Sequence, residues 1–246
     1  MYNFFVEPSQ INDKTVTILG SDVNHIKNVL RMKPGEEICV SNGFDGKEYR
    51  CGIESLEEDR IVCALRFIKE DGLELCSRVH LFQGLPKADK MELIIQKVVE
   101  LGVYDIIPVE TKRSVVKLDD KKAKQKTQRW QAISEAAAKQ SKRRVVPKVW
   151  EPVSFKEALN MAREMDVKLI PYELAENMEK TKQIISGLGE NLDIAIFIGP
   201  EGGFEDFEVQ AALEVGIEPI TLGKRILRTE TAGFTVMSWV MYQLEK

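Results

Sequence analysis

Hydrophobic and polar positions alternate in short stretches along the first part of the chain, with turn signals such as GFDG between them. The strands predicted from these stretches are YNFFV, TVTIL, EEICVSN, KEYRCGI and RIVCALRFI. Between the second and the third, SDVNHIKNVLR places its apolar residues on one helical face, with Ser21 or Asp22 as the N-cap. The pattern predicts a small β-barrel with one helix over residues 1–72.

In the rest of the chain, buried strands alternate with amphipathic helices. One predicted helix starts at Asp89 and stops at Gly102, and another starts at a capping box of Ser154 and Glu157. Six strands that alternate with helices predict an α/β domain over residues 73–246, with a mainly parallel sheet covered on both faces. The strand segments include RVHLFQGL, DIIPVE, VKLIPY, IAIFIG and PITLG.

The last predicted helix, AGFTVMSWVMYQLEK, is apolar almost all round. One face of such a helix can enter the core of its own domain, and the remaining apolar surface needs another cover. We therefore expect a homodimer in which this helix packs on the second subunit.

Composition indicates a cytoplasmic protein. The 246 residues are 43% hydrophobic and 30% charged, and no apolar run approaches the ~20 residues that span a membrane. The N-terminus, MYNFFVEPSQ, lacks the basic flank and apolar core of a signal peptide. The four cysteines are widely spaced and there are two histidines, so we expect reduced core thiols and no metal site.

Charge is unevenly distributed. Residues 112–148 contain 13 Lys and Arg against 3 Asp and Glu, although the whole chain has a net charge of −4. The positive charges of this segment repel one another unless a partner neutralises them. A polyanion such as a nucleic acid is a favourable partner, because each neutralised phosphate releases counterions. A merely solvated helix is the alternative, but the charge pattern favours contact with nucleic acid.

Two loops with small residues follow strands late in the sequence. IFIGPEGGFEDFE, residues 196–208, lacks the spacing of a dinucleotide-binding turn or a P-loop, and its Glu201 would repel a phosphate. LGKRILRTETAG, residues 222–233, adds an apolar wall, two arginines and an acid. Because open α/β sheets bind ligands beyond the carboxyl ends of their strands, the loops predict one site for a flat apolar ring with hydrogen-bonding edges. A tight strand-to-helix connection and surface ion pairs are the alternatives.

Five segments occur in order over nearly the whole chain: HIKNVLRMKPGE, QGLPKADKMELIIQKVVELGV, PVETKRSVVK with RWQAISEAAAKQS, IGPEGG and LGKRILRTETA. Together they resemble the RsmE family of ribosomal RNA methyltransferases in the SPOUT superfamily. The resemblance implies a PUA-like N-terminal barrel, an α/β domain with a deep trefoil knot, and a homodimer. It also implies that S-adenosylmethionine donates a methyl group to uracil N3 of one uridine of 16S rRNA, near the decoding centre of the small subunit.

The resemblance also assigns residues to the cofactor pocket, and the chemistry of the reaction suggests two catalytic candidates. The ten residues assigned to the S-adenosylmethionine pocket are Pro171, Tyr172, Gly199, Pro200, Glu201, Gly202, Leu222, Gly223, Ile226 and Leu227. Glu230 is the candidate base that removes the N3 proton, and the alternative is a first-turn acid favoured by the helix dipole. Arg228 is the candidate cation that stabilises the uracil anion.

Basic residues in both predicted domains are assigned to RNA docking. They are Arg31, Lys87, Arg113, Lys142, Arg143 and Arg144. A non-catalytic RNA-binding or ribosome-assembly protein of the same fold is the alternative function, and it would bind RNA without the cofactor. A nucleotide-dependent oxidoreductase is disfavoured because the sequence has no dinucleotide-binding turn.

Overall fold

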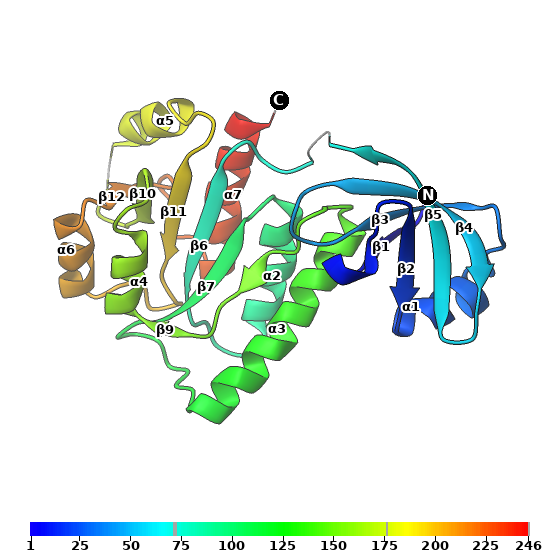
Figure 1. Ribbon diagram of the computed structural model, residues 1–246. Helices are drawn as coiled ribbons and strands as arrows, with labels where there is room; N and C mark the ends of the chain where they lie inside the picture. Colours follow the sequence, from blue (N-terminus) through cyan, green and yellow to red (C-terminus); the bar gives the residue numbers. More distant parts are fainter. Residues whose placement is uncertain (71–72, 176, 246) are drawn as a thin grey trace. The chain divides into compact units, whose positions relative to one another are not determined.

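The computed structural model describes residues 1–70, 73–175 and 177–245, and the chain forms two compact units (Figure 1). The first unit comprises Met1–Glu74 and Ala138–Val146, and the second comprises Leu75–Ala137 and Pro147–Lys246. Residue 72, where the first domain was expected to end, lies outside the described residues. The sequence pattern did not indicate that residues 138–146 return to the first unit.

Within the described residues, the first unit has a five-stranded sheet in the order β1-β3-β4-β5-β2. β1 pairs in parallel with β3, and the other neighbours are antiparallel. The elements are β1 (Asn3–Phe5), η1 (Pro8–Gln10), β2 (Thr15–Leu19), α1 (Ser21–Asn24), η2 (His25–Val29), β3 (Glu37–Ser41), β4 (Glu48–Leu56) and β5 (Arg60–Lys69). The prediction of a β-rich unit with one helical segment is confirmed.

The start of that helical segment differs from the prediction. α1 begins at Ser21 and its N-cap is Gly20, so the predicted N-cap at Ser21 or Asp22 is wrong. Gly20 has a φ of 75°, a left-handed conformation that glycine adopts without steric cost. After one turn the helix widens into the π-helical turn η2, and Arg31 follows with a φ of 55°. The exposed Arg31 therefore lies in a turn after the helix.

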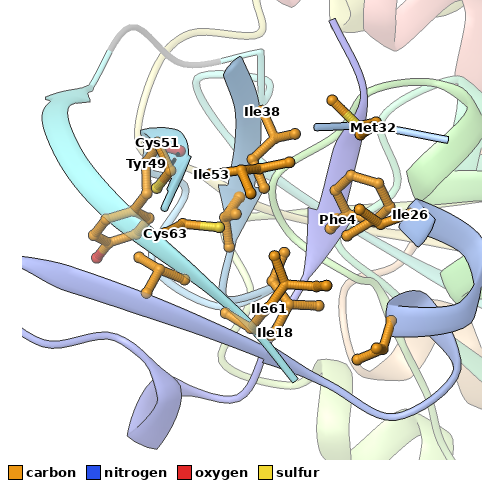
Figure 2. Packing of buried hydrophobic residues seen from close by; sticks show 14 residues of the cluster. Phe4, Ile18, Ile26, Met32, Ile38, Tyr49, Cys51, Ile53, Ile61 and Cys63 are labelled. Carbon is orange, nitrogen blue, oxygen red and sulfur yellow. Dashed lines mark hydrogen bonds between the residues drawn. The ribbon is translucent and has the colours of Figure 1, made fainter. Parts of the chain in front are cut away.

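The apolar core of the first unit contains Cys51 and Cys63 (Figure 2), and Cys39 of the same unit is buried as well. Ile18 and Ile26 are fully buried in it. Burial raises the pKa of Cys51 and Cys63 to about 12 and that of Cys39 to about 11. The three thiols therefore remain protonated near neutral pH, as expected for core cysteines.

Two buried ion pairs hold residues 138–146 in the first unit. Arg143 donates Nε–H to Glu74 Oε2 at 3.0 Å, and Arg144 pairs with Glu48. The two arginines are 5% and 4% exposed. The expectation that Arg143 and Arg144 dock RNA is therefore corrected, because neither guanidinium group is presented to solvent. Breaking a buried pair of this kind costs about 3–5 kcal/mol, which gives both arginines a structural role.

Within the described residues, the second unit has a seven-stranded sheet in the order β12-β10-β11-β6-β7-β8, with β9 paired to β7. Its strands are β6 (Arg78–Gly84), β7 (Asp105–Glu110), β8 (Lys148–Val149), β9 (Val153–Ser154), β10 (Val167–Pro171), β11 (Asp193–Ile198) and β12 (Glu218–Ile220). Every pairing is parallel. The predicted parallel sheet is confirmed. Over the described ranges it has seven strands instead of the six predicted, because two-residue strands such as β8 and β9 are too short to show a hydrophobic pattern in the sequence.

Helices cover both faces of this sheet, as predicted. The helices from residue 75 onward are α2 (Lys90–Glu100), α3 (Asp120–Gln140), whose last three residues belong to the first unit, α4 (Phe155–Ala162), α5 (Met178–Ser186), α6 (Asp206–Glu214) and α7 (Thr229–Leu244). α4 and α6 pack on the face that carries Phe82 and Phe197. Successive strand residues point to opposite faces, so Ile198 meets α7 at Gly233 on the other face, where α2 also contacts α7. The capping box of Ser154 and Glu157 is confirmed at the start of α4.

α7 has apolar residues on its outer surface as well as toward the sheet. Val236, Met237 and Val240 are buried, whereas Trp239 is partly exposed and Tyr242 is 84% exposed. In the described part of the chain, no helix combines the length and apolar character needed to cross a membrane.

At the opposite end of the sheet from the strands' carboxyl ends, a buried histidine joins three strands. His80 of β6 contacts Asp105 of β7 through Nδ1 at 2.8 Å and Asp193 of β11 through Nε2 at 3.1 Å. Arg78 donates to Asp193 at 2.6 Å, and Trp150 Nε1 donates to Asp105 at 2.9 Å. Burial opposes a charged imidazole, but the two carboxylates outweigh it and raise the pKa of His80. Burial likewise opposes ionisation of Asp193, but His80 and Arg78 lower the pKa of that carboxyl.

This cluster predicts a pH-dependent stability. The raised pKa of His80 means that its contribution is complete below the unfolded value of about 6.5 and is lost as the pH rises through the folded value. The contribution of Asp193 is instead lost as the pH falls through its lowered folded value. His80→Asn should therefore reduce the unfolding free energy more at about pH 5.5 than at about pH 8.5, as measured by urea unfolding. An equal loss at both pH values would contradict this account.

Candidate active site

A cavity of about 1010 Å³ lies beyond the carboxyl ends of β10, β11 and β12. Its wall comes mainly from residues 171–175, 198–204 and 221–229. The wall includes all ten residues that were assigned to the cofactor pocket: Pro171, Tyr172, Gly199, Pro200, Glu201, Gly202, Leu222, Gly223, Ile226 and Leu227. The structure thus brings the two loops together at one rim of the sheet, as expected from the sequence.

The glycine loop, residues 199–204, is shaped first by its own close packing. A Cβ atom at Gly199 would lie 3.1 Å from the backbone of Gly203. A Cβ atom at Gly84, the last residue of β6, would lie 2.7 Å from Pro200 N. Gly203 has a left-handed φ of 69°. Part of the glycine signal in the sequence therefore belongs to the fold and holds whether or not a ligand is bound.

Thr229 connects the two loops. Its Oγ1 donates to the carbonyl oxygen of Gly199 at 2.6 Å and accepts from Gln83 Nε2 at 2.9 Å. Gln83 is fully buried near the end of β6, and Thr229 is the first residue of α7. One hydroxyl group thereby fixes the glycine loop, the central strand and the start of α7 relative to one another.

Arg113 supports the glycine loop from the side. Its Nη1 donates to the carbonyl oxygen of Gly202 at 2.8 Å, and its Nη2 lies 3.0 Å from Glu205 Oε2. Next to it, the backbone N–H of Lys112 donates to the buried Glu208 at 2.9 Å. Arg113 was expected to dock RNA. It is exposed and lies in the cavity wall, where it holds the backbone of the loop, and its contact with RNA stays a prediction.

Glu201, which is also in the glycine loop, is bound by two neighbours. The backbone N–H of Lys87 donates to its Oε1 at 3.1 Å, and Lys90 Nζ lies 3.2 Å from the same oxygen. Burial would raise the pKa of Glu201, but the backbone N–H groups and Lys90 outweigh it and lower that pKa. Glu201 is therefore ionised at the rim of the cavity.

Lys90 was not singled out in the sequence analysis. Its Nζ also lies 3.3 Å from Glu230 Oε2, so one ammonium group joins the glycine loop to α7. The hydrogen bond to Glu201 raises the pKa of Lys90. A signal was present in the sequence, because Lys90 follows the predicted N-cap Asp89 in a first helical turn, where the helix dipole disfavours a cation.

The two candidate catalytic residues lie at the start of α7. Arg228 is its N-cap residue, is exposed and lines the cavity. Glu230 is in the first turn, its side chain is 14% exposed, and it approaches the cavity through its contact with Lys90. The position of Glu230 in the first turn is also one that the helix dipole favours for an acid.

The other residues assigned to RNA docking are spread over the two units. Arg31 and Lys142 are exposed in the first unit, and Lys87 is exposed in the second, beside the glycine loop. Because Arg143 and Arg144 are buried, the six assigned residues do not form one exposed set. Within the basic segment, lysines of α3 such as Lys121 and Lys124 are exposed, whereas Arg143 and Arg144 are buried.

The chemistry of the wall suits a ligand with an apolar ring and polar edges. Leu222, Ile226 and Leu227 provide apolar surface in the cavity wall. Ile226 is 90% exposed, so a ligand in the cavity could bury it. The glycine backbones provide hydrogen-bonding groups, and the ionised Glu201 provides negative charge. Across the described residues, no three His, Cys, Asp or Glu side chains are grouped so that they could hold a metal ion.

Comparison with known proteins defines the class. Residues 73–241 match the model of the RNA methyltransferase domain, and residues 18–65 match that of the RNA methyltransferase PUA domain. The first match covers the sheet and the whole cavity wall, and the second lies in the β-rich first unit.

Individual relatives narrow the class further. The ribosomal RNA small subunit methyltransferase E of Bacillus subtilis is 40% identical over 100% of this chain and 98% of its own length. That of Mesomycoplasma hyopneumoniae is 37% identical over 97% of this chain and 98% of its own length. The crystal structure of the enzyme of that name from Neisseria gonorrhoeae, bound to S-adenosyl methionine, has a TM-score of 0.81 at 33% identity, covering 97% of this chain and 95% of that one. The chain belongs to the RNA methyltransferase family, in its ribosomal RNA small subunit methyltransferase E branch.

The link through Thr229 can be tested by an isosteric substitution. Thr229→Val removes the hydroxyl group and deprives the Gly199 carbonyl and the Gln83 amide of a partner. We expect a loss of about 1–3 kcal/mol of unfolding free energy by chemical denaturation. Thr231→Val, two residues later and exposed, is the matched control and should stay within about 0.5 kcal/mol of the unmodified protein. Equal effects of the two substitutions would show that the hydroxyl of Thr229 makes no stabilising link.

Proposed function

We propose that this protein transfers a methyl group from S-adenosylmethionine to uracil N3 of one uridine of 16S rRNA, near the decoding centre of the small ribosomal subunit. The observation that carries the proposal is the convergence of the glycine loop and residues 221–229 on one cavity in an RNA methyltransferase domain. Relatives named for small-subunit rRNA methylation, one of them bound to S-adenosyl methionine, support this substrate and this cofactor. A ribosomal substrate implies a cytoplasmic protein.

The cavity fits the proposed cofactor. Its volume is at the upper end of the ~300–1,000 Å³ typical of ligand pockets. Leu222, Ile226 and Leu227 would contact the adenine ring, and the charge of Glu201 suits a ligand that carries positive groups. When bound, S-adenosylmethionine supplies both the electrophilic methyl group and the leaving group, so the residues of the chain have to position the reactants.

The proposed reaction requires a uracil whose N3 is accessible and deprotonated. N3 lies on the Watson–Crick edge, so the uridine has to be unpaired or extruded from its helix. Glu230 accepts the N3–H proton, a step that contributes ~10²–10⁴-fold in rate. Arg228, in the cavity wall, stabilises the negative charge that develops on the uracil. Alignment of N3 with the methyl group contributes up to ~7–11 kcal/mol.

The path of the chain after β12 supports the proposed trefoil knot. β12 is at the edge of the sheet, and β10 separates it from β11. Thr229 nevertheless bonds to Gly199, just after β11, and to Gln83 of β6. Residues 221–228 therefore pass across the ends of β10 and β11 before α7 begins. A crossing of this kind is what the knot implied by the resemblance requires.

The outer surface of α7 supports the proposed homodimer. The partly exposed Phe234, Trp239 and Met241 and the exposed Tyr242 give this helix an apolar surface beyond the one that packs on the sheet. Contact with a second copy of α7 would remove this surface from water.

For RNA docking we propose the first half of α3 together with the loop that precedes α2. Lys121 and Lys124 are exposed on α3. Lys126 of the same helix shares a cavity of about 150 Å³ with Leu85, Pro86, Ala88 and Asp89. The loop of residues 85–89 includes Lys87, whose N–H binds Glu201, so the lysines of α3 lie near the rim of the active-site cavity. This placement replaces the buried arginines and retains Lys87 and Arg113, and Arg31 and Lys142 remain candidates in the first unit.

Charge reversal tests this surface. Lys121→Glu combined with Lys124→Glu should weaken binding of a 16S rRNA fragment and reduce the slope of log K against log salt by about 1.5–2, because two phosphate contacts are lost. Fluorescence anisotropy at several salt concentrations measures both quantities. Lys156→Glu combined with Lys182→Glu makes the same charge change at exposed positions on α4 and α5 and is the control. Equal losses in the two double variants would assign the effect to net charge alone.

The activity itself is tested with methyl-labelled S-adenosylmethionine and small-subunit RNA or particles, followed by nucleoside analysis. We expect the label in 3-methyluridine at one position. RNA binding without incorporation would favour the non-catalytic RNA-binding protein. Label in another nucleoside would contradict the assignment of uracil N3.

A further inference from the structure

Lys90 occupies a position that is unfavourable for a cation. It is the first residue of α2, where the helix dipole is positive. Its Nζ lies 3.2 Å from Glu201 Oε1 and 3.3 Å from Glu230 Oε2, and its side chain is 29% exposed and lines the cavity. Two carboxylates from separate segments therefore offset the unfavourable position, one from the glycine loop and one from α7.

The Glu230 carboxylate is paired with the ammonium group of Lys90. Its Oε2 is shielded from solvent and has no well-directed hydrogen bond, so the contact with the ammonium group is mainly ionic. Lys90 on α2 contacts Glu230 directly and joins it to Glu201 on the glycine loop, and Arg228, two residues earlier in the chain than Glu230, lines the same cavity as Lys90 and Glu201. Removal of the ammonium group would leave a shielded carboxylate without its ion pair, which disfavours the charged form.

We propose that Lys90 is a positioning residue that holds the Glu230 carboxylate in place to accept the N3 proton, and that Glu201 keeps this carboxylate basic. The inference rests on the proposed function. Before the step, the cluster carries one positive and two negative charges. The N3–H bond then breaks, its electron pair remains on N3, and the proton binds a Glu230 oxygen. The cluster becomes neutral, with Lys90 still paired to Glu201.

Glu201 is essential to this arrangement. A Lys90–Glu230 pair alone would be a weak proton acceptor, because protonation of Glu230 would leave the ammonium group without a counter-charge. With Glu201 present the ammonium group keeps a partner at 3.2 Å after the transfer. The raised pKa of Lys90, due first to its hydrogen bond with Glu201, keeps the ammonium group charged throughout.

The arrangement predicts opposite effects of the two partners. Lys90→Met should move the acidic limb of the pH–rate profile upward by about 1 unit or more, because the carboxylate loses its counter-charge. Glu201→Gln should move the limb downward by a similar amount, because the ammonium group is then shared with Glu230 alone. Lys90→Arg keeps the cation and should retain a profile near that of the unmodified protein. Lys97→Met, the same substitution in the last turn of α2, is the matched control.

Two readouts separate this inference from the proposed function. Single-turnover methylation at saturating S-adenosylmethionine gives the pH–rate profile, and carbon-13 NMR of the unliganded protein gives the pH midpoint at which the Glu230 carboxyl titrates. Opposite shifts in Lys90→Met and Glu201→Gln support the inference in either readout. Shifts in the same direction, or no shift in both readouts, overturn it. Absence of N3 methylation by the unmodified protein would refute the proposed function, and the NMR midpoints would still decide whether the charge cluster acts as described.

Discussion

The hydroxyl group of Thr229 makes the contact on which the rest of the candidate active site depends. β11 and β12 provide the two loops of the site, yet β10 lies between these strands in the sheet. The chain after β12 has to cross the end of β10 to reach the glycine loop, and a crossing segment needs an anchor. Thr229 provides it through the Gly199 carbonyl and the buried Gln83 amide. Without this anchor the eight pocket residues of the glycine loop and of residues 221–229 would lie on two independent loops.

Two charged side chains also hold the glycine loop in place. Arg113 holds the carbonyl of Gly202 from one side, and Lys90 holds the carboxylate of Glu201 from the other. Charge-assisted contacts are about twice as strong as neutral hydrogen bonds, so the glycine loop is fixed although its residues have little side chain of their own. Groups fixed before a ligand binds need no reorganisation during the reaction, which is how preorganised sites stabilise charge. The same contacts link Glu230 to the loop that is proposed to hold the cofactor.

Much of the fold could be predicted from the sequence because its signals are local. The alternating strands and helices, the parallel sheet and the capping box at Ser154 all depend on residues that are close in the chain. The meeting of the two loops at one rim followed from a general property of open α/β sheets.

The features that could not be predicted depend on partners far apart in the chain. Arg143 contacts Glu74, 69 residues away in the sequence, and Arg144 contacts Glu48, 96 residues away. Part of a basic run that suggested an RNA-binding surface therefore forms buried ion pairs. The role of Lys90 could not be predicted for the same reason, because the two carboxylates that it contacts belong to the glycine loop and to α7, far from Lys90 in the sequence. No periodicity in the sequence reports such pairs.

The central claim is that two loops from separated strands form one S-adenosylmethionine site, and hydrogen–deuterium exchange tests it most directly. The unmodified protein would be compared with and without S-adenosylhomocysteine, the product form of the proposed cofactor. The account predicts that residues 199–204 and 221–229 become protected together, at the same ligand concentration. Binding of the ligand with protection of only one of these segments, or with protection elsewhere in the chain, would contradict it.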